Sequence, residues 1–145
     1  MGGSTSRSGK VQGLAGRRNP IDVRVEIDDE VWAEEVGRLR EHSPARAQAE
    51  KARREIEARP TTVPWQPCEE DGPRGTRLAE CVKLYVPIGQ EGASAAPYGF
   101  VFALREVEGT LVLRMLAFGE RHPTNPRTHP VYSRAHRRLH GRYPR

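Results

Sequence analysis

Acidic residues are missing from both ends of this 145-residue chain. None occurs in residues 1–19 or after Glu120, whereas residues 121–145 carry seven arginines and four histidines. All 19 acidic residues therefore lie in residues 20–120, where 13 basic residues leave a net charge of −6. An acidic body with two basic ends indicates a nucleic acid or an acidic protein as partner. A basic surface that only keeps the protein soluble is the alternative.

Cysteine and long apolar runs are also scarce. The two cysteines, Cys68 and Cys81, lack the spacing of a metal or redox motif, which favours a reducing compartment. The longest apolar candidate, residues 111–118, is too short to span a membrane and contains Arg114. Glycine and serine stand at the N-terminus, where a signal peptide would be apolar. We therefore expect a cytoplasmic protein without membrane contact.

The length of the chain predicts one domain. Glycine and proline together supply 26 residues, so much of the chain should be loop. We expect residues 1–19 to be a disordered basic tail and residues 20–145 to form the single domain.

The first half of the domain predicts one strand and two helices. Residues 21–27 alternate apolar and polar side chains, which is typical of a half-buried strand. The next apolar stripe, which predicts a helix of about three turns, consists of Trp32, Val36 and Leu39. Ser43 and Pro44 are suited to begin a second helix that Pro60 ends. The apolar stripe of this helix consists of Ala45, Ala49, Ala52 and Ile56. Because the two helices lie close in sequence, they should form a hairpin.

The second half predicts three strands and a short helix. The strands are expected at residues 79–86, 98–107 and 110–118, after a loop over residues 60–78. The last two should be joined by a tight hairpin turn, for which Gly109 supplies the positive φ. A basic helix should follow over residues 130–141. This order predicts an α+β fold, β-α-α-β-β-β, in which the helical hairpin packs on one face of a small antiparallel sheet. The opposite face, with Lys83 and Tyr85, should be partly open.

This order of elements and the late sequence resemble the RelE/ParE family of bacterial toxins from toxin–antitoxin pairs. The residues that carry the resemblance are the hairpin YGFVFALREVEGTLVLRMLAFGERHP and the following VYSRAHRRL. The opening IDVRVEIDDEVWAEEVGRL also resembles the first strand and helix of that family. The similarity covers roughly residues 20–140, apart from an enlarged loop at 60–78 and extra residues at 123–130.

For the ribonuclease branch of the family, the resemblance implies metal-independent cleavage of mRNA in the ribosomal A site. Lys83 matches a second-strand lysine of the family, Arg121 the arginine after the fourth strand, and Tyr132 the tyrosine of the last helix. Gly99 stands where the family has a third-strand arginine, and only one second-strand lysine is present. These departures are compatible with the other branch, which poisons gyrase without catalysis.

Cleavage of RNA through its own 2′-hydroxyl requires a base, fixed cations at the phosphate and an acid. Arg121 and Lys83 are the candidate phosphate clamps, and His122 adjoins Arg121. Tyr132 and His136 are four residues apart, on one side of the predicted helix. The predicted catalytic set is Arg121, Tyr132, Lys83, His122 and His136. The arginines predicted to contact nucleic acid are Arg127, Arg134, Arg137, Arg138 and Arg142.

Each of these residues has a plainer interpretation. Tyr132 is about as well suited to packing the last helix, and histidines on a basic helix are often ordinary surface residues. His136 and His140 have the spacing of a zinc pair, but no cysteine or carboxylate lies nearby in sequence to complete a site. We therefore expect no metal and no cofactor.

The first hypothesis is thus a RelE-like toxin that cleaves mRNA at the ribosome, inhibits translation and is held inactive by a cognate antitoxin. The first alternative is a non-catalytic toxin that acts on gyrase. The second alternative is a non-toxic, basic module that binds nucleic acid or the ribosome.

Overall fold

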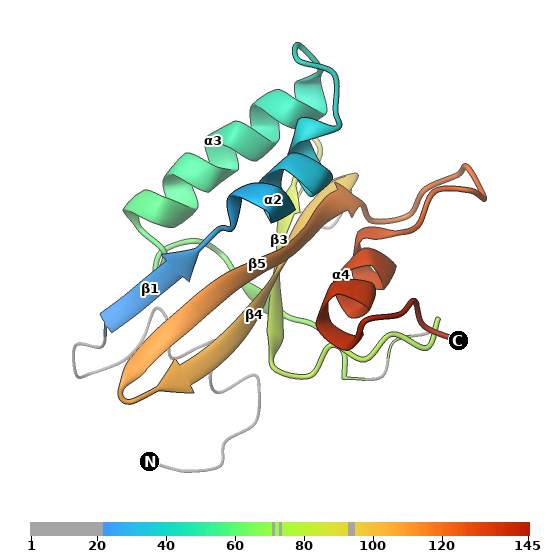
Figure 1. The fold of residues 1–145 in the computed structure, drawn as a ribbon. Coiled ribbons are helices and arrows are strands. Elements are labelled where there is room, and N and C mark those ends of the chain that lie inside the picture. Colours follow the sequence, from blue (N-terminus) through green and yellow to red (C-terminus); the bar gives the residue numbers. More distant parts are fainter. Residues whose placement is uncertain (1–21, 71, 73, 93–94) are drawn as a thin grey trace.

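The computed structural model describes residues 22–70, 72, 74–92 and 95–145, so the expected tail over residues 1–19 lies outside the described residues. The elements are β1 (Asp22–Glu26), α2 (Asp29–Trp32), the π-helical η1 (Ala33–Gly37), α3 (Pro44–Ala58), β2 (Gln66–Pro67), β3 (Cys81–Val86), β4 (Tyr98–Val107), β5 (Thr110–Glu120) and α4 (Val131–His140). The α+β class and the predicted order are confirmed, with β2 as an addition inside the expected loop (Figure 1). Across the described ranges, no helix combines the length and apolar character that a membrane crossing requires.

Side-chain caps set where the two helices of the hairpin begin. Asp28 Oδ1 accepts hydrogen bonds from the backbone N–H of Glu30 at 2.8 Å, which satisfies a donor that the first turn leaves unpaired. Ser43 Oγ accepts one from the backbone N–H of Arg46 at 3.2 Å, and Pro44 stands at the first position of α3. The buried side chains of α3 are those of its predicted stripe, Ala45, Ala49, Ala52 and Ile56.

Within the described residues the sheet has five strands in the order β1-β5-β4-β3-β2. The β4–β5 hairpin turns at Glu108 and Gly109, whose φ values of 50° and 83° suit a two-residue hairpin turn. β1 pairs with β5 in parallel, with Val23 opposite Leu111, so the sheet is mixed and not wholly antiparallel as expected. The alternation in β1 predicts which side chains are buried. It does not predict strand direction, because a helical hairpin and not a tight turn follows β1.

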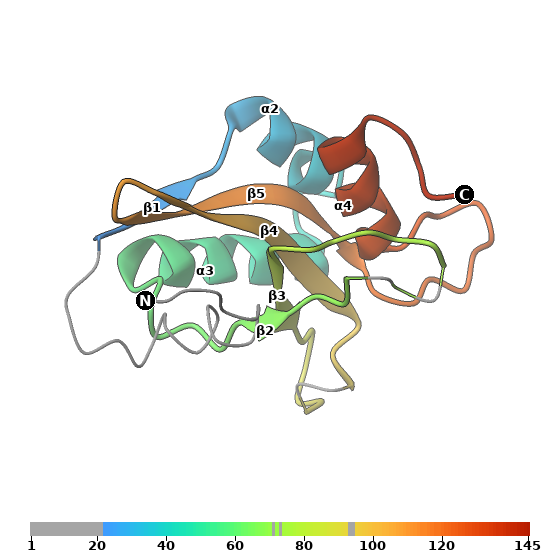
Figure 2. The ribbon, with the colours of Figure 1, turned by 90° about the horizontal axis from the view of Figure 1, so that it is seen from below.

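The sheet has a packed cluster on each face. One cluster joins the apolar face of α3 and Val36 of η1 to the strands. The other joins Val131 and Ala135 of α4 to Cys81, Val101 and their neighbours, with Leu78 from the loop. Figures 1 and 2 show α3 and α4 on opposite sides of the strands. The face that was expected to be partly open is therefore largely covered, because α4 folds back over it.

An irregularity in the β4–β5 pairing creates a contact for α4. Val101 lies opposite Ala117 and Phe102 opposite Met115, which leaves Leu116 as an extra residue on β5. The carbonyl of Leu116 accepts a hydrogen bond from Arg138 Nε at 2.7 Å. The bulge thus leaves a carbonyl for an arginine of α4, which helps to fix the helix across the sheet.

Candidate functional site

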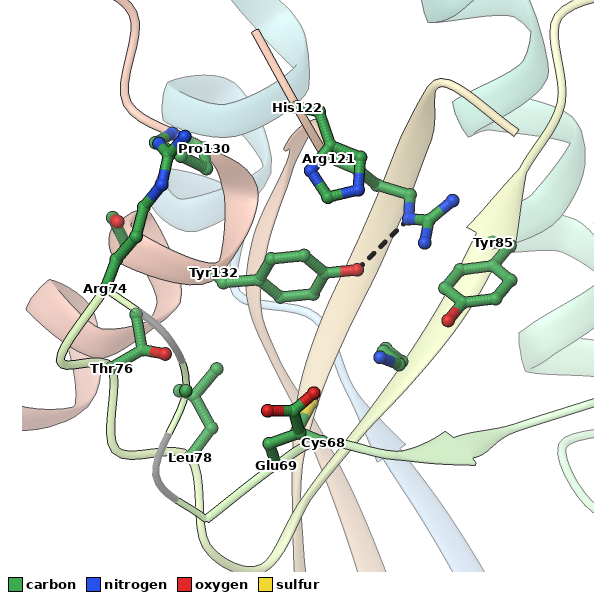
Figure 3. Close-up of a pocket in the computed structure, with 13 residues that line it drawn as sticks. Cys68, Glu69, Arg74, Thr76, Leu78, Tyr85, Arg121, His122, Pro130 and Tyr132 are labelled. Atoms are coloured by element: carbon green, nitrogen blue, oxygen red, sulfur yellow. Dashed lines mark hydrogen bonds between the residues drawn. The ribbon is translucent and has the colours of Figure 1, made fainter. Parts of the chain in front are cut away.

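A pocket of about 300 Å³ lies where β3, the end of β5, the start of α4 and the loop before β3 meet (Figure 3). One wall comes from the sheet and α4 and carries Lys83, Tyr85, Arg121, His122 and Tyr132. The other wall comes from the loop and carries Cys68, Glu69, Arg74, Thr76 and Leu78. The fold therefore brings together four of the five residues predicted to be catalytic, although they are separated by up to 49 positions in the chain.

Arg121 is held in place by hydrogen bonds and by an aromatic ring. Its Nε donates a hydrogen bond to Tyr132 Oη at 3.1 Å, and its Nη1 donates one to the Ala96 carbonyl at 2.9 Å. The guanidinium carbon lies 3.8 Å from the centre of the Tyr85 ring, which is the geometry of a cation–π contact. Figure 3 shows Arg121 between the two tyrosines. A guanidinium held in this way is pre-organised for an anion.

The glycine at position 99 makes room for Arg121. A Cβ atom at Gly99 would lie 3.4 Å from Cγ of Arg121, so the stem of the arginine passes directly over β4. Gly99 lies opposite Tyr85 on β3, which explains why Arg121 reaches the Tyr85 ring. The absence of a side chain at this strand position therefore allows Arg121 to occupy the space above it.

Lys83 brings a second cation to the same wall. Its Nζ lies 5.3 Å from the ring centres of both Tyr85 and Tyr132. Within the part of the chain that the structure describes, no acidic side chain forms a salt bridge with Lys83. The pocket therefore combines a fixed guanidinium and an ammonium group with two aromatic rings, a composition typical of sites for phosphate groups next to planar bases.

The sequence did not predict that the loop before β3 forms one wall of the pocket. Glu69 and Arg74 line the pocket from the segment that was expected to be only an enlarged loop. Their side chains are exposed, and no alternation in this proline- and glycine-rich stretch indicates which of them point inward. Tyr85, also missed as a site residue, could have been found, because it is two positions after Lys83 on the same strand.

His136 lies outside the pocket, in contrast to the other predicted catalytic residues. Its ring is 5% exposed, and Nδ1 accepts a hydrogen bond from the backbone N–H of Arg77 at 2.9 Å. Burial lowers the pKa of His136, and the nearby His140, Arg142 and Arg77 lower it further. His136 therefore binds the backbone at Arg77. It does not line the pocket and would not contact a ligand there.

Three of the five arginines predicted to contact nucleic acid form ion pairs within the protein. Arg134 binds the fully buried Glu35 with two hydrogen bonds, Nε to Oε1 at 2.9 Å and Nη2 to Oε2 at 2.7 Å. Arg138 binds Glu34 at 2.7 Å and Glu35 at 3.0 Å, and Arg137 binds Glu34 at 3.2 Å. The hydrogen bond from Arg138 is the main cause that lowers the pKa of Glu34. These ion pairs fasten α4 to η1, which contains Glu34 and Glu35.

The remaining two predicted arginines, Arg127 and Arg142, are exposed. Their side chains lie before and after α4, so they extend the basic surface beyond the pocket. In the described ranges, no three histidine, cysteine or acidic side chains lie together in a way that could hold a metal ion.

Comparison with known proteins gave no assignment: no family model, no curated protein and no solved structure matches this chain.

Proposed function

We propose that the protein is a RelE-like toxin, an endoribonuclease that cleaves mRNA at the ribosome and so inhibits translation. The observation that carries the proposal is the convergence of Arg121, Tyr132 and Lys83 on one pocket, since these are the residues that match the family motif. The hydrogen bond between Arg121 and Tyr132 and the stacking on Tyr85 support it further, because they place a phosphate-binding group next to a proton donor.

The proposed reaction uses the 2′-hydroxyl of the RNA as nucleophile. The bond between the 2′-oxygen and phosphorus forms while the bond from phosphorus to the 5′-oxygen breaks, leaving a 2′,3′-cyclic phosphate and a 5′-hydroxyl. Arg121 and Lys83 stabilise the charge that builds on the phosphate oxygens. One of Glu69 and His122 takes the 2′-hydroxyl proton, and Tyr132 or His122 returns a proton to the leaving 5′-oxygen.

The partners follow from the same proposal. The ribosome and its mRNA would meet the basic surface that Arg127 and Arg142 extend, and a cognate antitoxin with acidic residues would compete for it. The protein would act in the cytoplasm, where the ribosomes are. The three arginines paired with Glu34 and Glu35 would contribute little to this contact, because their charge is already matched.

A second candidate is a non-catalytic member of the same superfamily that acts on gyrase, or a module that only binds nucleic acid. Gly99 and the single lysine of β3 favour this alternative, because the family's ribonucleases carry more cations at these places. The position of Arg121 over Gly99 weakens the objection, because the stem of Arg121 occupies the space that a third-strand side chain at this position would enter.

Pulse labelling after induced expression in a bacterial host tests the proposal. Amino-acid and thymidine incorporation are followed separately for the wild type and for the double variant Arg121→Ala/Tyr132→Phe. We expect a rapid, selective loss of amino-acid incorporation that the double variant abolishes. Selective loss of thymidine incorporation would favour the gyrase alternative, and no effect on either would favour a binding module.

A further inference from the structure

One wall of the pocket is fastened to α4 through main-chain atoms. The wall segment consists of residues 74–78, and its alternate side chains Arg74, Thr76 and Leu78 line the pocket. The residues between them, Gly75 and Arg77, are exposed and do not line the pocket. A Cβ atom at Gly75 would lie 2.8 Å from the carbonyl oxygen of Arg145, so the end of the chain lies close to the segment at this point.

Two histidines hold the segment at Arg77. Nδ1 of His136 accepts the hydrogen bond of the Arg77 N–H at 2.9 Å, and Nε2 of His140 lies 2.9 Å from the Arg77 carbonyl oxygen. The two imidazole rings lie 4.5 Å apart on successive turns of α4. Because Thr76 and Leu78 flank Arg77, a shift of this one peptide would move two lining residues of the pocket.

The bond to His136 exists only while the imidazole is neutral. An Nδ1 atom that accepts a hydrogen bond has no proton, and in the imidazolium both ring nitrogens carry one. Protonation would therefore set an N–H group against the N–H of Arg77 at hydrogen-bond distance. The charged and titratable groups around His136 are Arg77 of the segment, His140 of α4 and Arg142 after it, and all of them oppose a further positive charge.

We propose that His136 is a positioning residue: its neutral ring latches the wall segment to α4 and keeps the pocket formed, and its protonation releases the wall. The group acts through Arg77 and does not touch the substrate. The expected effect of the latch on ligand binding in the pocket rests on the proposed function.

The direction of the pH effect follows from the pKa of His136, which the fold lowers. With the wall open, the ring has a pKa closer to the ordinary value of about 6.5, so the open form binds the proton more readily. The latch is therefore fully stable above about pH 6.5 and is progressively lost as the pH falls from there toward the lower pKa of the latched form.

Amide hydrogen exchange of Arg77, measured by NMR as a protection factor, tests the latch directly. In the wild type we expect protection to fall at least about tenfold between about pH 7.5 and about pH 5. His136→Asn retains an acceptor near the Nδ1 position and does not titrate, so protection should be retained at both pH values. His136→Leu should lose the protection of the Arg77 amide at both pH values. His42→Asn, which removes an exposed histidine far from the segment, should behave like the wild type.

Constant protection of Arg77 in the wild type, or an unchanged pH dependence in His136→Asn, would overturn the latch. The wild-type profile provides this test even if a variant fails to fold.

Binding of a single-stranded 2′-O-methyl RNA, which cannot be cleaved, tests the link to the pocket. Relative to His136→Asn, the wild type should lose at least about threefold in affinity between about pH 7.5 and about pH 5, because only its wall opens. The comparison cancels the pH effects that the two proteins share. If the wild type and His136→Asn show equal affinities for the RNA at both pH values, the positioning role is overturned. If this RNA binds at neither pH while Arg77 protection titrates, the proposed function fails and the latch stands.

Discussion

At the scale of single residues, Tyr85 determines how well Arg121 is placed. The ring covers one face of the guanidinium at 3.8 Å, while Tyr132 and the Ala96 carbonyl hold two of its nitrogens. Removing the ring leaves the hydrogen bonds but allows the guanidinium to tilt, and a small displacement of a catalytic cation costs much of its effect.

We expect Tyr85→Leu to lower the rate of RNA cleavage about tenfold or more, mainly in kcat, whereas Tyr85→Phe should stay within about threefold of the wild type. The conservative variant is the control, because it keeps the stacking ring and removes only the hydroxyl. Single-turnover cleavage rates with the three proteins give the answer. Equal rates for the leucine and phenylalanine variants would show that the stacking does not matter.

Glu35 is the residue on which the position of α4 depends most. Its carboxylate is fully buried and accepts hydrogen bonds from Arg134, Arg138 and the backbone N–H of Phe118. Replacing the charge by an amide would leave Arg134 without an acidic partner at a partly buried site and Arg138 with Glu34 alone.

Glu35→Gln should therefore lower the free energy of unfolding by about 3 kcal/mol. Glu34→Gln should lower it by less than about 1 kcal/mol, because the Glu34 side chain is 54% exposed and its ion pairs are screened by water. Urea denaturation of the two variants and the wild type measures the difference. A loss in Glu35→Gln no larger than that in Glu34→Gln would contradict the role assigned to the buried carboxylate.

At the scale of elements, the strand β4 is shaped around Arg121. An alanine at position 99 would place its methyl group 3.4 Å from Cγ of Arg121, in ordinary van der Waals contact. A leucine would extend into the space that the arginine stem occupies.

We expect Gly99→Ala to retain most of the cleavage activity and Gly99→Leu to lose at least about tenfold, with little change in thermal stability because position 99 faces the pocket wall. Thermal denaturation alongside the cleavage assay separates a displaced Arg121 from an unfolded protein. Full activity of the leucine variant would mean that Arg121 need not lie over β4.

The elements whose pattern repeats along the sequence were predictable. The stripe of α3, the cap at Ser43 and the hairpin at Gly109 depend on neighbouring residues, and the structure confirms them. The bulge at Leu116 and the parallel pairing of β1 were not predictable, because both depend on contacts between distant segments. The burial of Glu35 was not predictable either, because it results from the wider π-helical turn of η1, which buries Glu35 beside Val36.

The candidate site was predictable to the extent that it lies on regular elements. Lys83 on β3, Arg121 after β5 and Tyr132 on α4 line the same pocket. The loop wall with Glu69 and Arg74 was not predictable, because the conformation of a proline- and glycine-rich segment depends on what it packs against. His136 was predicted from helical spacing alone, which does not reveal that Arg77 fills the space beside it.

At the scale of the whole molecule, the charges divide into an internal set and an external set. The internal set fastens α4 to Glu34 and Glu35 of η1 and consists of Arg134, Arg137 and Arg138. Arg127 and Arg142 are exposed, one before and one after α4. Of these five arginines, only the external pair should release counterions when RNA binds.

The logarithm of RNA affinity should therefore decrease linearly with the logarithm of salt concentration, and the double variant Arg127→Gln/Arg142→Gln should reduce the slope by about 1.4. Arg54→Gln/Arg59→Gln is the matched control, because these two arginines are exposed and lie on and directly after α3, on the opposite side of the sheet from α4. Salt titrations of binding to a single-stranded RNA provide the slopes. An unchanged slope in the double variant would exclude both arginines from the contact.

The chemistry at the ends of the RNA fragments tests the central claim most directly. Purified protein is incubated with ribosomes that carry a defined mRNA, and the new 3′ and 5′ ends are identified for the wild type and for Arg121→Ala. We predict fragments with a 2′,3′-cyclic phosphate and a 5′-hydroxyl, lost in the variant, because the 2′-hydroxyl attacks a phosphate that Arg121 holds. Intact mRNA, or fragments with a 3′-hydroxyl, would contradict the assignment of this pocket as a ribonuclease site.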